Sequence, residues 1–425
     1  MMTALLLAAL LSIGPSVQTF KVDVDVPVEH DWVYTGKGAC KLDVNLSSET
    51  SGGRLVLSLD LVTDTSLMSK DRDTVLTVTR DVRLRKGSRS LTLNMGKLAP
   101  GFYQVNLSVQ GAEASFKPQR VFNIGVRPEE IVSPQDKQPD FDEFWNATLA
   151  ELAKVPVDAE YTLDPEHSDS LRSTYIVKFK SFGGETVGGI LCKPNKPGKY
   201  TTYIDYLGYG ANIIWYEPSA APQTVEFLLS VRDQGIFKRK GHYRWIDRGL
   251  ESKEEFYYRG AFCDVVRAID FVSSLDCVDP DYLFARGESQ GGAFTFISVS
   301  LDHRIKACAP SVPFLADYPD YWRIVRWPMW EVFEECDKKG ISRDELMTML
   351  SYFDIKNFAD RIECPMLMAF GLQDGTCPPH TNFAAYNLVP APKEYYCGPL
   401  LGHGLWCDKD WYAARAAWFA PREKK

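Results

Sequence analysis

The spacing of apolar residues changes once along the chain, and this change constrains the fold more than any other feature. From residue 20 to residue 127, short runs such as LVLSL at 55–59 alternate apolar and polar side chains, with Gly, Ser, Asp and Asn between the runs. A period of two residues broken by turn residues is typical of strands in an antiparallel sandwich. We therefore expect a small all-β, immunoglobulin-like domain over residues 19–127.

After residue 140 strand-like and helix-like segments alternate, and the polar, proline-bearing stretch 128–139 between the two patterns predicts a linker. Asp140 followed by Glu143 favours a capping box that opens a helix running to about Lys154. Beyond it we expect strands at 176–179, 201–206, 282–285, 365–370 and 394–396, and helices at 258–275, 293–301, 345–352 and 408–419. This alternation predicts an α/β domain over residues 140–425, with helices packed on a mostly parallel sheet.

The amino-terminal residues 1–18 contain one apolar run, residues 4–13, followed by small residues. A membrane-spanning helix needs about 20 apolar residues, so this run is too short to cross a bilayer. We interpret it as a signal peptide and expect export, although neither Lys nor Arg precedes the run. No later segment is long and apolar enough to predict a membrane span.

The net charge and the spacing of the cysteines argue against several classes of binding partner and cofactor. The 48 basic and 56 acidic side chains give a net charge of −8, which repels phosphate backbones and argues against a nucleic-acid partner. The ten cysteines include no Cys-x-x-Cys pair, a spacing that disfavours zinc or a redox dithiol. We expect most of them to be buried core residues, with disulfide pairing left open. We expect neither a metal nor an organic cofactor.

The strongest local motif is GESQGG at 287–292, which lies between a predicted strand and a predicted helix. A Gly-x-Ser-x-Gly in this context is the nucleophile elbow of an α/β-hydrolase, because the tight turn leaves no room for side chains beside the serine. Ser289 is therefore the predicted nucleophile. The alternative is a glycine-rich loop in which the serine is solvent-exposed and has no catalytic role.

A nucleophilic serine needs a histidine base and a carboxylate that orients the histidine. In an α/β-hydrolase the acid follows a late strand and the histidine follows the last strand. Asp374 lies in the loop after the predicted strand 365–370, and His403 lies between the last predicted strand and the closing helix. We predict the triad Ser289, Asp374 and His403, with His380 as the less favoured base because it precedes the last strand.

Acyl transfer also needs two N–H donors that stabilise the negative charge on the carbonyl oxygen. The backbone N–H of Gln290, directly after the nucleophile, is the first predicted donor. The loop LGYG at 207–210 follows the predicted strand 201–206, and its glycines would let the chain turn toward the substrate. The N–H of Tyr209 is the second predicted donor, and an ordinary strand-exit turn is the alternative.

Several motifs together resemble the acetyl xylan esterase / cephalosporin C deacetylase family, carbohydrate esterase family seven. They are DFDEFW at 140–145, GY at 208–209, RDQG at 232–235, YYRG at 257–260, GESQGG at 287–292, LSYFD at 350–354, GLQD at 371–374 and CPP at 377–379. The resemblance covers about residues 140–419 and leaves the sandwich outside it. It implies a serine esterase that deacetylates small acetylated sugars and related compounds, often as a ring-shaped homo-oligomer.

The chain departs from the family pattern beside the predicted triad. The family usually has Arg-Gly-Gln where this chain has Arg232, Asp233 and Gln234, and usually has His-Glu where this chain has His403-Gly404. We hypothesise that Asp233 replaces the missing glutamate as the charge partner of Arg232 or of another nearby base. Leu207 replaces a common histidine, which predicts a differently shaped acyl pocket.

Alternative functions remain open at this point. Residues 318–341, with Trp322, Trp327 and Trp330, could form a lid that stacks on sugar rings, a helical core or an oligomer contact. A serine peptidase with an amino-terminal β domain, or an acyltransferase, would use the same triad. A carbohydrate-binding protein on a decayed hydrolase is the non-enzymatic alternative.

Overall fold

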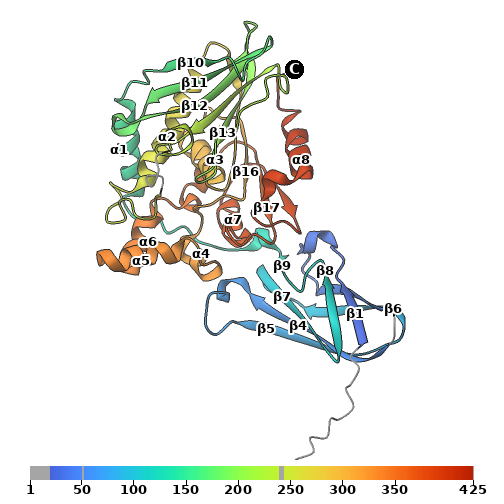
Figure 1. Ribbon diagram of the computed structural model, residues 1–425. Coiled ribbons are helices and arrows are strands. Elements are labelled where there is room, and N and C mark those ends of the chain that lie inside the picture. The colour runs from blue at the N-terminus through green and yellow to red at the C-terminus, as the bar shows by residue number, and fades with distance from the viewer. Residues whose placement is uncertain (1–19, 50–51, 239–243, 425) are drawn as a thin grey trace, which may run out of the picture.

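The computed structural model describes residues 20–49, 52–238 and 244–424, which form a β-sandwich and a larger α/β part (Figure 1). The predicted signal peptide lies outside these described residues. Within the described ranges, no helix combines the length and the apolar character needed to cross a bilayer.

The sandwich consists of two sheets with strand orders β6-β3-β1-β8 and β2-β9-β7-β4-β5. Its strands are β1 (Phe20–Asp25), β2 (Val33–Tyr34), β3 (Cys40–Ser48), β4 (Gly53–Thr63), β5 (Thr74–Leu84), β6 (Gly87–Gly96), β7 (Gly101–Gln110), β8 (Ala112–Lys117) and β9 (Val121–Val126). Alternate residues such as Val44, Leu57 and Leu107 fill the space between the sheets. Most pairs are antiparallel as expected, but β1–β8 and β2–β9 are parallel because strands distant in sequence meet there.

A nine-stranded sheet of order β10-β11-β12-β14-β13-β15-β16-β17-β18 forms the centre of the α/β part. Its strands are β10 (Glu160–Asp164), β11 (Arg172–Lys180), β12 (Thr186–Pro194), β13 (Tyr200–Tyr206), β14 (Thr224–Ser230), β15 (Val278–Glu288), β16 (Ala307–Ser311), β17 (Met366–Gly371) and β18 (Lys393–Gly398). The pairs from β14 to β18 are parallel, whereas β10, β11, β12 and β14 pair antiparallel. All five predicted strands are present, and β10, β12, β14 and β16 were not predicted.

The helices are α1 (Phe141–Ala153), α2 (Tyr257–Ser273), α3 (Gln290–Leu301), α4 (Tyr318–Ile324), α5 (Met329–Lys339), α6 (Arg343–Ser351), α7 (Pro379–Tyr386) and α8 (Lys409–Phe419). Short 3₁₀ helices are η1 (His30–Trp32), η2 (Asp64–Ser66), η3 (Pro128–Glu130), η4 (Phe182–Gly184), η5 (Gly235–Phe237), η6 (Ile355–Asn357), η7 (Ala359–Arg361) and η8 (Leu405–Cys407). The predicted helices correspond to α1, α2, α3, α6 and α8 to within about one turn. Trp145 of α1 stacks on Phe262 of α2, so these two helices share one aromatic core.

The predicted capping box at the start of α1 is wrong. Asp140 occupies the N-cap position, but its side chain makes no capping hydrogen bond. Its carboxylate instead accepts hydrogen bonds from the Lys253 ammonium group and the Tyr352 hydroxyl. A full cation from a distant segment is a stronger partner for a carboxylate than a local backbone N–H.

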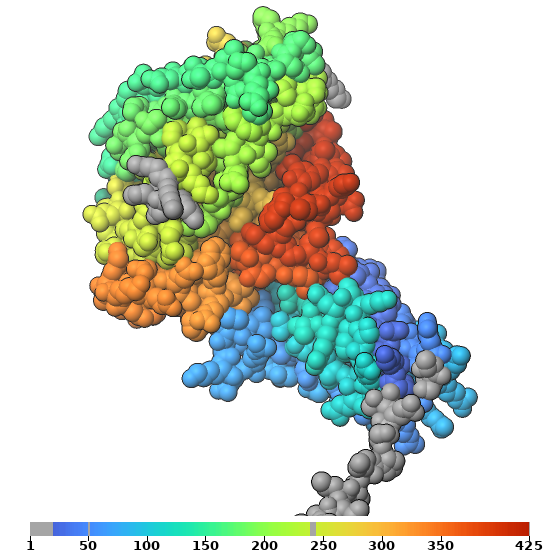
Figure 2. Space-filling model, viewed as in Figure 1, coloured from blue at the N-terminus to red at the C-terminus, as the bar shows by residue number. Residues whose placement is uncertain are grey.

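The sandwich contacts the carboxyl-terminal half of the α/β part (Figure 2). The Asn123 side chain donates to the Leu372 carbonyl at 3.1 Å, and the Asn123 backbone N–H donates to Gln373 Oε1 at 2.7 Å. Gln373 Nε2 returns a hydrogen bond to the Asn123 carbonyl at 3.2 Å. Phe102 of β7 packs against Phe383 of α7, with ring centroids 5.8 Å apart. The sandwich therefore holds the loop that contains Asp374.

His380 forms a charged link across the same interface. Its Nδ1 lies 3.0 Å from Asp64 Oδ2, and its side chain is buried. Burial lowers the pKa of His380, but the charge and hydrogen bond of Asp64 outweigh this effect and raise the pKa to about 9. The less favoured candidate base is thus held in the interface rather than beside Ser289.

We expect His380→Gln to destabilise the protein in a pH-dependent manner. Because the folded-state pKa is raised, the stabilisation is complete below the unfolded pKa of about 6.5 and is lost as the pH rises through about 9. The free energy of unfolding of the variant should be lower than that of the parent by up to about 3 kcal/mol at pH 6, with a much smaller difference at pH 10. Denaturant titrations at both pH values test this, and a difference independent of pH would contradict it.

Candidate active site

The turn that carries Ser289 has the strained geometry of a nucleophile elbow. Ser289 has φ 60° and ψ −119°, lies directly after β15 and begins α3. A Cβ on Gly287 would lie 2.3 Å from the Gly291 carbonyl oxygen, and one on Gly291 would lie 2.0 Å from the Tyr206 carbonyl oxygen. Both glycines are therefore required by close backbone contacts, which is the physical content of the motif.

The structure brings the three predicted triad residues together. His403 Nε2 lies 2.9 Å from Ser289 Oγ, and His403 Nδ1 lies 2.9 Å from Asp374 Oδ2. The backbone N–H groups of Thr376 and Cys377 donate to Asp374 Oδ1, which fixes the buried carboxylate. With Nδ1–H donated to Asp374, Nε2 can accept the serine proton.

Opposing effects act on the pKa of His403. Burial lowers it, whereas the hydrogen bond to Asp374 and the negative charge of that carboxylate raise it, and the net direction is upward. A base of raised pKa holds a transferred proton more firmly, so this environment suits a histidine that takes a proton from a hydroxyl and returns it.

Gln234 connects the two loops that carry the predicted oxyanion donors. Its Oε1 accepts from the Gly210 backbone N–H at 3.1 Å, and its amide pairs reciprocally with the amide of Gln290 at 3.1 Å. A Cβ on Gly208 would lie 4.0 Å from Ser289 Cβ, so the loop containing Tyr209 runs beside the nucleophile. This arrangement is consistent with the roles predicted for the Gln290 and Tyr209 N–H groups, which remain predictions.

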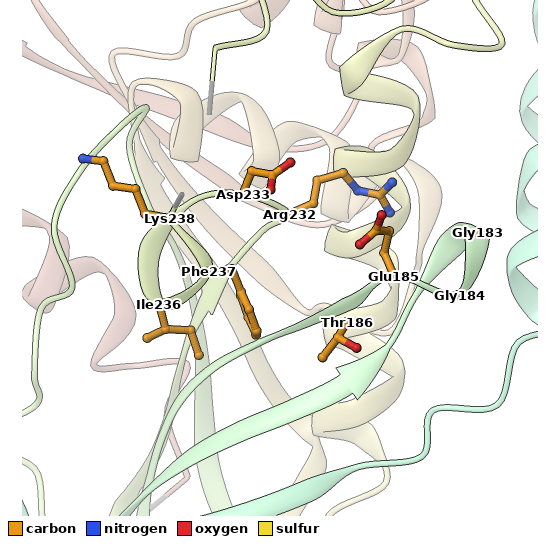
Figure 3. A pocket seen from close by; sticks show the side chains of 9 residues that line it. All are labelled: Gly183, Gly184, Glu185, Thr186, Arg232, Asp233, Ile236, Phe237 and Lys238. Atoms are coloured by element: carbon orange, nitrogen blue, oxygen red, sulfur yellow. The ribbon is translucent and has the colours of Figure 1, made fainter. Parts of the chain in front are cut away.

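Arg232 and Asp233 have separate partners, so Asp233 does not serve as the partner of Arg232. The Arg232 guanidinium forms an ion pair with Asp264 of α2 at 2.8 Å, whereas Arg248 Nη1 donates to Asp233 Oδ2 at 2.7 Å. Arg232, Asp233 and Glu185 line a pocket of about 570 Å³. Figure 3 shows the Arg232 side chain extending toward Glu185, whereas Asp233 points away from it. Arg232 therefore pairs with the buried carboxylate of Asp264. The base that pairs with Asp233 is Arg248, which fits the alternative in the hypothesis that Asp233 pairs with another nearby base.

We expect the contact between Asp233 and Arg248 to contribute modestly to stability. Asp233 has φ 60°, a conformation that Asn tolerates and Gly prefers. Asp233→Asn should lower the free energy of unfolding by about 1 kcal/mol because it removes the charge alone. Asp233→Gly should cost less, since it also relieves backbone strain. Denaturation of both variants tests this order, and an Asn variant as stable as the parent would rule out the stabilising contact.

A cavity of about 680 Å³ opens beside Ser289 and His403. Its lining combines apolar side chains with charged ones, namely Leu207, Ile213, Ile214, Trp406 and Tyr412 with Asp205, Glu226, Arg286, Glu288 and Arg415. Leu207, the departure noted in the sequence, is part of this lining. Burial raises the pKa of Glu288 to about 7, although the nearby His403 lowers it. The cavity can hold a substrate next to the nucleophile.

The three tryptophans of residues 318–341 are not among the residues that line this cavity. Trp322 packs edge-on against Phe333, and Arg326 lies over the Trp330 ring at 4.5 Å. Trp327 approaches Tyr209, with ring centroids 6.5 Å apart. The segment forms α4 and α5, and α4 packs against η2 of the sandwich, so stacking on a bound sugar remains only a prediction.

Asp317, Asp320 and His380 are a group whose donor atoms lie within 4.8 Å of one another and could approach a cation. However, Asp317 already accepts from the Lys356 ammonium group, and His380 pairs with Asp64. These ion pairs account for the cluster. All ten cysteines lie in the described ranges and are free, and most of them are buried, as expected for core residues.

Sequence reasoning missed three groups that shape the site. Asp264 is fully buried on α2, Arg286 lies near the end of β15, and Arg415 lies on α8. An ionisable residue on the apolar face of a predicted helix or inside a predicted strand could have signalled Asp264 and Arg286. No comparable signal marks Arg415, because a single basic residue is common in a helix that contains both polar and apolar residues.

The comparisons with known proteins agree with this geometry. The profile of the family described as acetyl xylan esterase (AXE1) matches residues 129–406. Acetyl esterase Axe7A of Xylanibacter ruminicola is 28% identical over 421 residues, covering 94% of this chain and 90% of that protein. The acetyl xylan esterase of Paenibacillus sp. R4 is 28% identical with a TM-score of 0.64, covering 70% of this chain and 99% of its own. Acetyl xylan esterase 1 of Thermoanaerobacterium sp. JW/SL YS485 is 26% identical with a TM-score of 0.64, covering 70% and 98%.

Proposed function

This chain belongs to the acetyl xylan esterase family and is a carboxylic ester hydrolase of the α/β-hydrolase fold, and from this premise we propose that Ser289, His403 and Asp374 are its catalytic residues. Its substrates are acetylated xylo-oligosaccharides or related small acetylated compounds. The observation that supports the assignment most directly is the continuous hydrogen-bond chain from Ser289 through His403 to Asp374, at 2.9 Å for each contact.

The geometry supports an acyl-enzyme mechanism. Ser289 Oγ attacks the acetyl carbonyl carbon while His403 Nε2 takes the hydroxyl proton, and Asp374 stabilises the imidazolium that forms. The N–H groups of Gln290 and Tyr209 stabilise the oxyanion. The sugar hydroxyl leaves with the proton from His403, and a water activated by His403 then releases acetate and restores Ser289.

The choice among esterase, peptidase and binding protein is open to a direct assay. We expect the purified protein to release acetate from acetylated xylo-oligosaccharides and to hydrolyse p-nitrophenyl acetate, with far lower kcat/KM on dipeptide amides. Preferential cleavage of the amides would identify a peptidase instead. Sugar binding without hydrolysis of either ester would identify a non-catalytic protein.

Two further features are part of the proposal. The apolar run in residues 1–18 supports export of the mature enzyme, and amino-terminal sequencing of the exported protein tests where the chain is cleaved. The resemblance to a family of ring-shaped esterases supports a homo-oligomer, and light scattering of the purified protein measures its mass in solution.

A further inference from the structure

One cation in the catalytic cavity has no carboxylate partner among the residues that the structure describes. Arg415 of α8 lines the same cavity as Ser289 and His403. Its guanidinium lies over the Tyr412 ring at 4.8 Å and near the Trp411 ring at 5.8 Å. The charges of Asp205 and Glu288 act on it, but it forms no ion pair with a described residue. Aromatic faces position the guanidinium but leave its N–H donors available for a ligand.

The other charges of the cavity wall balance one another. The Arg286 guanidinium forms ion pairs with Asp205 at 2.5 Å and with Glu226 at 2.9 Å. Glu226 also pairs with the fully buried Arg172 at 2.8 Å. The two guanidinium groups of this network are therefore balanced by its two carboxylates. The positive charge of Arg415 is not balanced by this network.

Glu288 does not cancel this surplus charge. Burial, offset only in part by the nearby His403, raises its pKa to about 7, so the group is protonated in a large share of molecules at neutral pH. Its Oε1 is buried without a hydrogen-bond partner in the described structure. Burial and the neighbouring Arg286 lower the pKa of Arg415 to about 10, which still leaves Arg415 charged at neutral pH. The cavity therefore combines a cation with an acid that can donate a proton.

We propose that this cavity binds acetylated saccharides that carry a carboxylate, such as acetylated uronic acid residues, and that Arg415 is the residue that recognises the carboxylate. The inference rests on the proposed function and narrows its substrate class. A guanidinium presents N–H donors in a planar fork that matches both oxygens of a carboxylate. One surplus positive charge matches a monoanion, and the protonated Glu288 can donate a further hydrogen bond to it.

The test compares two matched acetyl esters, an acetylated methyl glucuronide and the acetylated methyl glucoside that lacks the carboxylate. We expect the parent protein to have the higher kcat/KM on the glucuronide ester, and Arg415→Gln to lower the glucuronide-to-glucoside ratio by about 10- to 100-fold, as for a hydrogen bond between charged groups. Arg415→Lys should retain part of the ratio, since it keeps the charge without the fork. Lys409→Gln removes the same charge from an exposed position of α8 and should leave the ratio unchanged.

Binding is measured separately by calorimetry on the Ser289→Ala protein, with and without Arg415→Gln. Tighter binding of the glucuronide ester that depends on Arg415 supports the proposal even if turnover is slow. Equal affinity for both esters, or an equal change in the Lys409→Gln control, would overturn it. Failure of the parent to hydrolyse either ester, with Arg415-dependent binding intact, would instead count against the proposed esterase function.

Discussion

Replacing Ser289 with alanine is expected to lower kcat for p-nitrophenyl acetate by about four to six orders of magnitude. The substitution removes the hydroxyl oxygen that His403 Nε2 contacts at 2.9 Å, and so it removes the covalent step. Residual hydrolysis would come from water held near the oxyanion donors. Steady-state kinetics measure the loss, and mass spectrometry of quenched reactions should detect the acetyl-enzyme in the parent and not in the variant.

A matched control is available on the same helix. Ser300 is a buried serine of α3 whose hydroxyl donates to the Phe296 carbonyl at 2.7 Å, away from the cavity lining. Ser300→Ala should keep kcat within a few fold of the parent, since it deletes a hydroxyl that has no role in the reaction. If Ser289→Ala retained more than about one percent of parental activity, the assignment of the nucleophile would be wrong.

The largest expected effect on stability comes from Asp264→Asn. Asp264 is fully buried and accepts hydrogen bonds from the Arg232 backbone and guanidinium at 2.8–3.0 Å and from Ser181 at 2.6 Å. The amide would leave the partly buried Arg232 guanidinium without its counter-charge, at a cost of about 3 kcal/mol. The melting temperature should fall by roughly 3–6 °C, since the entropy of unfolding grows with chain length. Activity should fall as well, because Gln234 follows Arg232 by two residues.

Two further variants distinguish the cost of leaving Arg232 without a counter-charge from the cost of losing an ion-pair contact. Replacing both partners by apolar residues, Arg232→Met with Asp264→Leu, should recover part of the lost stability because no unpaired charge remains. The recovery is incomplete because the Ser181 hydroxyl and the Arg232 backbone N–H lose their acceptor. Glu335→Gln breaks an exposed pair with Lys338 and should leave the melting temperature unchanged. An Asp264→Asn variant as stable as the parent would show that Arg232 finds another counter-charge.

The elements that carry the proposed catalytic residues were predictable from sequence because their signals are local. The turn around Ser289 requires glycines within a few residues, and the acid and base follow strands whose order along the chain is recognisable. Strands with a period of two or a continuous apolar run, and helices with an apolar face, were likewise found. Strands β10, β12 and β16 carry weaker or mixed patterns, and their neighbours in the sheet stabilise them. Strand β14 is a short buried apolar run that was overlooked.

By itself, the sequence determined the two-part architecture, the elbow and the order of Ser289, Asp374 and His403. Only the tertiary structure decided which charges meet: Arg232 with Asp264, His380 with Asp64, and Arg415 with no carboxylate among the described residues of the cavity. The physical reason is that backbone geometry depends on neighbouring residues, whereas the partner of a charged side chain depends on which distant elements the sheet and the domain interface bring within a few ångströms.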